Sequence, residues 1–295
     1  MRMKAGAFSL LLVFVTVGCA WNAAGTTGCQ LVAPPVPLPD ALHESSGVAS
    51  SLAHPGTIWS HNDGGEPLLF ALDMDGRLLA RIPFHGGEVW DWEDLAVSRC
   101  GDWSCLYLAD IGDNEEIRDP IRLLRIREPT DLEDGVSLSA EEFPVSLPDG
   151  PRDMEAIFVL PGEEVFFVSK GRSHAQTVYR YPPPLRAGEL VDLEEIQVLS
   201  SGSMPIPAQI TGAEASRDGA LIALRTYEAL FFYRMEEGRL VPIEGGRVSL
   251  GTLREPQGEA VGFGPAGKIL LTTEGGNFGG TASLRILECG GLPGK

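Results

Sequence analysis

Five glutamates recur along the chain, each opening a short run of small or apolar residues, at intervals of 45 to 62 residues. They are Glu44, Glu93, Glu155, Glu214 and Glu259. In a repetitive fold, residues at equivalent positions of successive repeats lie close together. Carboxylates crowded in this way repel one another, so they need a bound cation or protons to compensate them.

Further polar side chains stand at the end of the next apolar run of each repeat. If the two runs are antiparallel strands, the end of the second returns to the level at which the first begins. We therefore expect one face of the ring to combine the glutamates with these side chains: His61, Asn62, Asp63, Asp110, Asn114, Lys170, Arg225, Glu274 and Asn277.

This set of donors favours calcium as a bound metal. Calcium takes six to eight oxygen ligands from carboxylates, amides and water. A zinc site would need further histidines or thiolates, and the ring holds a single histidine. The candidate calcium ligands are Glu44, Glu93, Asp94, Glu155, Glu214, Glu259, Asn62 and Asn114.

Two cations in the same ring leave other interpretations open. Lys170 and Arg225 could neutralise Glu155 and Glu214, which would make the ring a structural network of salt bridges without a metal. In a catalytic site the proton would be moved by Glu93, Asp110 or His61, while Lys170 and Arg225 would hold an anionic group of the substrate. A hydrogen-bonded structural role for His61 is an equal alternative.

The elements that position these residues are predicted to be strands. The chain has 36 glycines and 22 prolines spread along its length, which is typical of many short strands joined by turns. Each repeat contains three clear β-forming runs, with weaker fourth runs such as 78–83 and 194–199. Such periods predict the blades of a single all-β propeller. Five repeats favour five blades, and six remain possible if one degenerate blade escapes the alignment.

The last repeat shows only three strands, and the segment 30–38 precedes the first repeat. We expect this N-terminal segment to supply the missing outer strand and so close the ring. A disulfide between Cys29 and Cys289 would lock the same seam, and Cys100 with Cys105 would close a short loop between two strands.

The N-terminus is predicted to be an export signal. Arg2 and Lys4 precede an apolar run, 5–17, that is too short to span a bilayer. The run ends in a segment that resembles the lipobox of bacterial lipoproteins, which implies cleavage before Cys19 and attachment of lipid to its thiol. We therefore expect a signal peptide 1–18, a lipidated tether 19–28 and a propeller domain 29–295 that is anchored in the bacterial cell envelope. Ordinary secretion without a lipid anchor is the alternative. Ala20 after the cysteine favours the outer membrane.

The net charge of −18 excludes several classes of partner and enzyme. It cannot attract nucleic acid. The sequence also lacks the nucleophile elbow of serine hydrolases, the P-loop and the zinc-peptidase helix motif. Trp90 and Trp92 flank Asp91, and we expect one of them to pack between blades.

Several segments together resemble an uncharacterised family of secreted bacterial β-propeller lipoproteins. The segments are Trp59-Ser-His-Asn-Asp-Gly, Asp91-Trp-Glu-Asp-Leu-Ala, Ala109-Asp-Ile-Gly-Asp-Asn, Asp153-Met-Glu-Ala and Gln257-Gly-Glu-Ala, with Glu44-Ser-Ser-Gly and Glu128-Pro. A wider similarity at Glu93 and Asp94 links the chain to calcium-binding propellers such as paraoxonases and gluconolactonases. That similarity implies an axial metal held by acidic and asparagine side chains.

Two classes of function follow from these patterns. The first is a calcium-dependent hydrolase of a small substrate, such as a lactone, a phosphoester or a glycoside. The second is a non-catalytic propeller that serves as a scaffold or sensor and binds a glycan or protein partner.

Overall fold

The structure is a computed structural model, and it describes residues 28–87, 89–275 and 280–291. The signal peptide, the lipidation site Cys19 and the tether up to residue 27 lie outside the described residues, as does Asn277. The described chain is almost entirely strand, with short 3-10 helices at η1 (Ile206–Ala208), η2 (Gly251–Leu253) and η3 (Pro265–Gly267).

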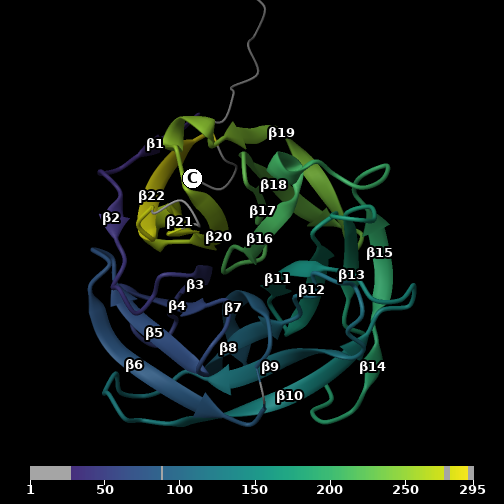
Figure 1. Ribbon diagram of the computed structural model, residues 1–295, viewed down its shortest axis with the longest axis horizontal. Helices are drawn as coiled ribbons and strands as arrows, with labels where there is room; N and C mark the ends of the chain where they lie inside the picture. Colours follow the sequence, from purple (N-terminus) through teal and green to yellow (C-terminus); the bar gives the residue numbers. More distant parts are fainter. Residues whose placement is uncertain (1–27, 88, 276–279, 292–295) are drawn as a thin grey trace, which may run out of the picture.

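The strands form five blades around a central axis (Figure 1). In each blade the first strand lies nearest the axis and the later ones follow outward as antiparallel neighbours. Blade 1 contains β3 (Ser45–Ser50), β4 (Thr57–Asn62), β5 (Leu68–Asp73) and β6 (Leu78–His85). Blade 2 contains β7 (Trp92–Cys100), β8 (Trp103–Asp110), β9 (Ile121–Arg127) and β10 (Leu138–Ser146).

The remaining blades repeat this plan. Blade 3 contains β11 (Met154–Leu160), β12 (Glu164–Ser169), β13 (Thr177–Arg180) and β15 (Glu194–Val198), while β14 (Val191–Asp192) pairs with β10. Blade 4 contains β16 (Ile210–Ala215), β17 (Ile222–Thr226), β18 (Ala229–Glu236) and β19 (Arg239–Ser249). Blade 5 contains β20 (Gln257–Phe263), β21 (Ile269–Glu274), β22 (Ser283–Gly290) and β1 (Gly28–Leu31). The predicted five-bladed propeller is confirmed.

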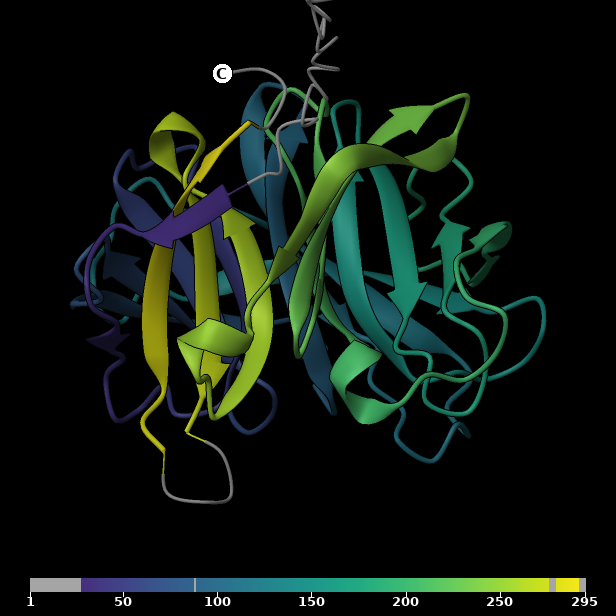
Figure 2. The same cartoon turned by 90° about the horizontal axis from the view of Figure 1, so that it is seen from above.

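The N-terminal strand closes the ring as predicted. β1 pairs antiparallel with β22, Cys29 stands opposite Cys289, and a disulfide joins the two residues. The short strand β2 (Val36–Pro37) pairs with the other end of β22. Figure 2 shows β1, in purple, lying across the yellow C-terminal strands. The predicted disulfide between Cys100 and Cys105 is also present, at the turn between β7 and β8.

The inner strands are buried on both faces because each packs between two neighbouring blades. β11 reads Met-Glu-Ala-Ile-Phe-Val-Leu and all seven of its residues are buried. The outer strand β10 alternates between more buried and more exposed residues, as expected for a strand with one solvated face. The inner strands also approach one another closely: a Cβ at Gly212 would lie 2.8 Å from the carbonyl oxygen of Glu259 in the next blade. Only glycine fits at that contact.

Blades 1 and 2 are tied together by a buried carboxylate. Glu128, after β9, accepts hydrogen bonds from the indole N–H of Trp59 at 2.7 Å and from the Ser51 hydroxyl at 2.5 Å. It also accepts the backbone N–H of Ala53 at 3.0 Å. Trp92 packs in the same seam, which confirms that one tryptophan of the Trp90–Trp92 pair lies between blades.

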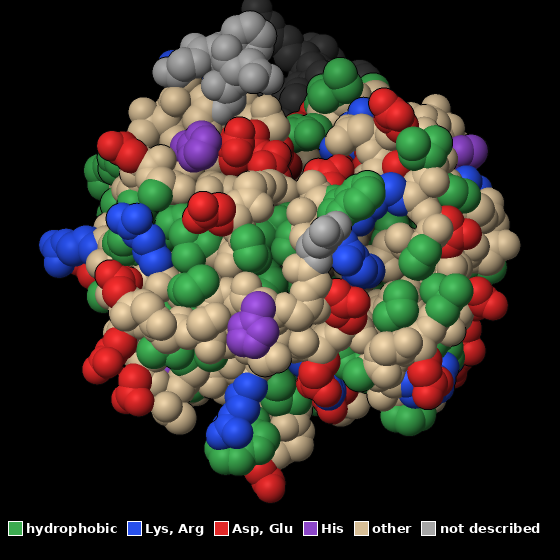
Figure 3. Space-filling view, turned by 60° about the horizontal axis from the view of Figure 1, so that its bottom comes forward, with side chains coloured by type: hydrophobic (Ala, Val, Ile, Leu, Met, Phe, Trp, Pro, Cys, Tyr) green, Lys and Arg blue, Asp and Glu red, His purple; other side chains and the backbone are tan. Residues whose placement is uncertain are grey.

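Acidic, basic and hydrophobic side chains are interspersed over the side of the molecule drawn in Figure 3. Much of the acidic excess is therefore ordinary solvated surface. In the described part of the chain, no helix combines the length and apolar character needed to cross a bilayer.

Candidate functional site

A β-bulge recurs near the start of all five inner strands. In each, the register with the second strand shifts by one or more residues, and the residue at the shift points away from the regular ladder. The residues at these bulges are Ser46, Glu93, Glu155, Thr211 and Glu259. Three of the five predicted glutamates therefore occupy equivalent positions.

Glu44 and Glu214 do not share that position, so the predicted alignment of all five glutamates is wrong for these two. Glu44 stands two residues before the bulge of β3, and Glu214 stands three residues after the bulge of β16. The residues two before each bulge are Glu44, Asp91, Asp153, Gln209 and Gln257. This recurring acidic or amide residue two places before the bulge is a signal that the sequence carries and that the glutamate alignment missed.

A third equivalent set stands at the end of each second strand or directly after it, beside the bulges. It consists of Asp63, Ile111, Lys170, Tyr227 and Glu274. We use the name axial acidic cluster for the carboxyls that face one another at this end of the axis: Glu44, Asp63, Asp91, Glu93, Glu155, Glu259 and Glu274.

Asp91 and Glu93 form a hydrogen-bonded carboxyl pair. Burial raises the pKa of Glu93 well above its ordinary value, and the charges of Glu155 and Asp91 raise it further. Burial likewise raises the pKa of Asp91, although the hydrogen bond with Glu93 opposes that rise. Gly112 lies directly against both carboxyls, and a Cβ there would overlap them. The glycine of the Ala109-Asp-Ile-Gly segment is therefore needed to make room for this pair.

Lys170 supplies the cation of the cluster. Its ammonium forms an ion pair with Glu155 and lies 4.0 Å from Asp153. Burial alone would lower the pKa of Lys170, but the surrounding carboxylates, Glu155 first, raise it. The predicted pairing of Lys170 with Glu155 is confirmed. Burial still raises the pKa of Glu155 to about 8, against the opposing effect of Lys170.

The other carboxyls of the cluster form no ion pair with Lys170, although the charges of Lys170 and Arg225 oppose the rise that burial causes in the pKa of Glu259. Burial raises the pKa of Glu274 to about 8, and Glu259, Asp63 and Glu44 add to it. Burial raises the pKa of Glu259 to about 7 and, together with Glu44, that of Asp63 to about 6. Asp63 and Glu274 therefore have raised pKa values and form no ion pair within the described residues.

Two acidic residues lie deeper along the axis and bind backbone amides. Asp94 accepts hydrogen bonds from the N–H groups of Ile157 and Ala213, both at 3.0 Å, from blades 3 and 4. Glu214 accepts the N–H of Phe263 in blade 5 at 2.7 Å. Burial raises the pKa of both carboxyls well above the ordinary values. Their oxygens are used to join inner strands across the channel.

Arg225 is fully buried and does not pair with Glu214, so that predicted ion pair is wrong. Its guanidinium donates to Glu255 at 2.6 Å and to the carbonyl oxygens of Ala260 and Thr272 at 2.5 and 2.9 Å. It thus joins blade 4 to blade 5. Tyr227, two residues on, follows the end of β17 at the level of the bulge.

His61 is buried between blades 1 and 2. Its ring stacks on that of Trp92, with centroids 5.0 Å apart, and its Nδ1 lies 2.8 Å from the carbonyl oxygen of Asn62. Burial lowers the pKa of His61 to about 4. The geometry supports the structural alternative, a neutral packed histidine, over a general base.

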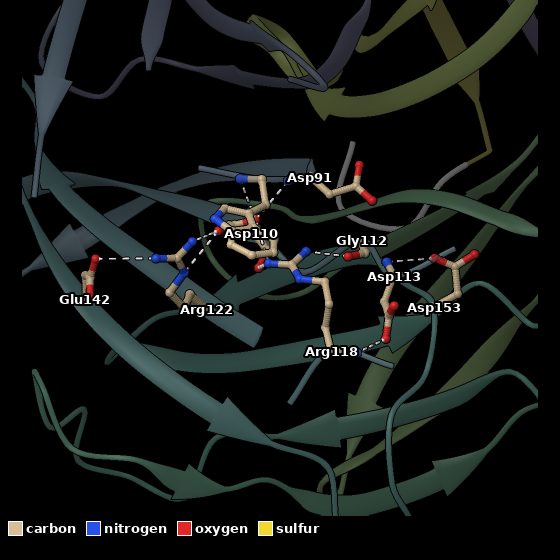
Figure 4. A network of polar contacts seen from close by, with 9 residues as sticks. Asp91, Asp110, Gly112, Asp113, Arg118, Arg122, Glu142 and Asp153 are labelled. Atoms are coloured by element: carbon tan, nitrogen blue, oxygen red, sulfur yellow. Dashed lines mark hydrogen bonds and ion pairs between the residues drawn. The ribbon is translucent and has the colours of Figure 1, made fainter. Parts of the chain in front are cut away.

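Asp110 is the centre of a network of polar contacts (Figure 4). One oxygen accepts the backbone N–H groups of Trp90 and Asp91 at 3.2 and 3.0 Å and the guanidinium of Arg118 at 2.9 Å. The other accepts two hydrogen bonds from Arg122, at 3.1 and 2.6 Å. Both oxygens of Asp110 are engaged, and one of them holds the backbone of Asp91 in place.

The two predicted asparagine ligands lie outside the cluster. Asn62 accepts the N–H of Glu44 at 3.0 Å and donates to the carbonyl of Ala41 at 2.9 Å, so it shapes the turn before β3. Asn114 is exposed in the loop after β8. Among the residues that the structure describes, no three acidic, histidine or cysteine side chains converge as metal ligands.

The fold and site define a five-bladed β-propeller with an acidic cluster at one mouth of its channel. No family model matches the chain, and no curated protein matches it at a significant level. Among solved structures, the chain is similar to a PQQ-bound aldose sugar dehydrogenase from Streptomyces coelicolor, with 12% identity and a TM-score of 0.53 over 90% of this chain and 100% of that one.

Other similar structures include a glucose dehydrogenase, with 12% identity and a TM-score of 0.49 over 88% of this chain and 100% of that chain. A gluconolactonase from Xanthomonas campestris has 14% identity and a TM-score of 0.41 over 90% of this chain and 98% of its own. At such identities the likeness is one of fold. The expected distant relation to propeller proteins is confirmed at that level.

Proposed function

We propose that the axial acidic cluster is the active site of a hydrolase for a small substrate, a lactone, a phosphoester or a glycoside, with calcium as its cofactor. The observation that carries the proposal is the buried, hydrogen-bonded pair of Asp91 and Glu93. Burial raises the pKa values of both carboxyls, and the hydrogen bond between them allows the pair to share a proton. Such a pair can accept a proton at one carboxyl and donate one from the other.

Hydrolysis of a lactone illustrates what these residues would do. The attacking water gives a proton to the ionised carboxylate of the pair as its oxygen bonds to the acyl carbon. The ring C–O bond then breaks, and the protonated carboxyl supplies a proton to the leaving oxygen, so that one water is consumed. Lys170 places positive charge beside the reacting group, where negative charge develops on the carbonyl oxygen.

Calcium fits the chemistry of the other side of the cluster. Glu44, Asp63, Glu259 and Glu274 offer only oxygen donors, and the charges of neighbouring carboxyls help to raise the pKa values of Asp63, Glu259 and Glu274. These four side chains would hold the ion by drawing together around it. The ion would supply Lewis-acid polarisation of a substrate oxygen.

The decisive experiment measures hydrolysis by the purified protein. A δ-lactone, 4-nitrophenyl phosphate and 4-nitrophenyl β-glucoside serve as probes, with Glu93→Gln as the test variant and Glu195→Gln, at an exposed position, as its matched control. We expect kcat for the accepted probe to fall about 100-fold in Glu93→Gln and to stay unchanged in the control. Hydrolysis that survives Glu93→Gln would remove this pair from the reaction. If no probe is hydrolysed, the non-catalytic scaffold or sensor becomes the better proposal.

Calcium is tested separately, without reference to activity. Chelator-treated protein is titrated with calcium in a calorimeter, and Glu259→Gln is compared with Glu195→Gln. We expect binding to the wild type and the control and at least tenfold weaker binding to Glu259→Gln. Absence of heat and of any shift in melting temperature would remove calcium from the proposal.

We further propose that the protein is exported and lipid-anchored in the bacterial cell envelope through Cys19. The two disulfides support export, because such bonds persist in oxidising compartments. Cys19→Ala tests the anchor in fractionated cells: we expect the wild type in the membrane fraction and the variant in the soluble one. Equal distribution of the two proteins would leave export without a lipid anchor.

A further inference from the structure

A hollow of about 430 Å³ opens beside the channel mouth, on blade 2. A volume of this size is in the range of small-molecule sites. It is lined by Trp90, Ile117, Arg118, Asp119, Pro120 and Arg122.

The apolar part of this hollow is unusually exposed. Ile117 is 70% exposed, a value that Ile206 equals and no other large hydrophobic side chain of the described residues exceeds, and Trp90 follows at 66%. Exposed apolar side chains that lie next to one another indicate a binding surface, whereas single exposed apolar side chains are common on any protein. The Trp90 backbone is held by its hydrogen bond to Asp110, so the indole is carried on a fixed support.

The polar part of the hollow is cationic. Arg118 and Arg122 share the single buried carboxylate of Asp110. Glu142 lies 3.8 Å from Arg122, and Asp119 accepts a hydrogen bond from the Ser146 hydroxyl at 2.6 Å. Two guanidinium groups held this way offer planar donors suited to a carboxylate or a phosphate. The lining itself carries two guanidinium groups against one carboxylate, that of Asp119.

The aromatic and cationic parts are adjacent. The guanidinium carbon of Arg118 lies 5.8 Å from the centre of the Trp90 ring. A ligand can therefore place an apolar body against Trp90 and Ile117 while its anionic group reaches Arg118 and Arg122.

We propose that this hollow binds a small organic anion, a carboxylate or a phosphate ester, with an aromatic or other apolar body. The proposal concerns binding alone and holds whether or not the axial acidic cluster is catalytic. Asp110 is a positioning residue for the hollow, because it fixes Trp90 and both arginines.

Calorimetric titration with three probes tests the proposal. 4-Methylbenzoate and phenyl phosphate carry the anion, and 4-methylbenzamide is the uncharged isostere of the first. We expect at least one of the two anions to bind, and the amide to bind at least tenfold more weakly than that anion. Stronger binding of 4-methylbenzoate would indicate a carboxylate site, and stronger binding of phenyl phosphate a phosphate site.

Variants locate the binding. Trp90→Ala and Arg122→Gln are each expected to weaken the anion about tenfold or more. Trp103→Ala is the matched control, because Trp103 is 53% exposed beside Arg127 at the opposite end of β8 from Asp110. Melting temperatures of all variants show that they are folded. Equal binding of the amide, or equal loss in Trp103→Ala, would overturn the proposal, and so would the absence of binding by both anions.

Discussion

Asp94 of blade 2 accepts a hydrogen bond from the backbone N–H of Ala213 in blade 4, at 3.0 Å, across the axis of the propeller. The same oxygen accepts the N–H of Ile157 in blade 3 at 3.0 Å, and the other oxygen accepts the N–H of Leu95 at 2.9 Å. One carboxylate therefore satisfies amides of three inner strands.

Removal of this carboxylate should destabilise the whole ring. Asp94→Ala leaves buried N–H groups without an acceptor, and we expect a loss of about 2–4 kcal/mol in the free energy of unfolding. Asp94→Asn keeps one acceptor oxygen and should cost less. Chemical denaturation measures both, with Asp192→Ala at an exposed site as control. A loss in Asp94→Ala no larger than in the control would contradict this role.

Stability should fall as pH rises from about 5 to 8.5. The pKa values of Asp63, Glu259, Glu155 and Glu274 are raised to about 6, 7, 8 and 8, above those of an unfolded chain near 4. The folded state therefore retains protons that the unfolded state has released. This contribution is complete below about pH 4 and is lost as pH passes through about 6 to 8.

We expect the melting temperature of the chelator-treated protein to drop by about 5 °C or more over that interval. Calcium should reverse the drop at pH 8, because a ligand that binds only the folded state stabilises it. A melting temperature that stays level or rises with pH would show that these carboxyls titrate at ordinary values.

Gly112 should be intolerant of a side chain. Gly112→Ala places a methyl group on the carboxyls of Asp91 and Glu93, and we expect the pair to separate. The expected result is a hydrolysis rate lowered at least tenfold for any accepted probe, together with a changed pH profile. Gly202→Ala is the matched control because nothing lies within 4 Å of the added Cβ. Equal rates in both variants would mean that the site relaxes around the methyl group.

The two disulfides should differ in their effect on stability. The Cys29–Cys289 bond closes a separation of 260 residues, and the Cys100–Cys105 bond closes one of 5. In the chain-entropy account of disulfides, removal of the first costs about 5 kcal/mol and removal of the second about 2 kcal/mol. Denaturation of the two double-alanine variants measures both values. A larger loss for the short loop would contradict the account given of the blade 5 seam.

The strands of this fold were predictable because the repeats are regular at the level of whole elements. The second and third strands of every repeat are found, and β1 and β2 fall in or beside the segment expected to close the ring. Turn residues and β-forming runs carry that information locally.

The register of the site was not predictable in the same way. Inner strands such as β11 are buried on both faces and show no alternation that would fix which residue faces the axis. A bulge then shifts the direction of each following side chain. For this reason Glu214 and Arg225 do not point to the predicted place. Glu93, Glu155 and Glu259 do share one position, because each stands at the bulge of its strand. The positions of Tyr227 and Asp153 beside the cluster follow from the bulge registers and not from the sequence pattern.

The bond between Cys29 and Cys289 makes the backbone between these residues a covalent circle. A protease that cuts a single exposed turn anywhere within that circle leaves one molecule and not two fragments, since the remaining chain and the disulfide still join the cut ends. A nicked propeller of this kind would keep all five blades tethered and able to re-form the ring.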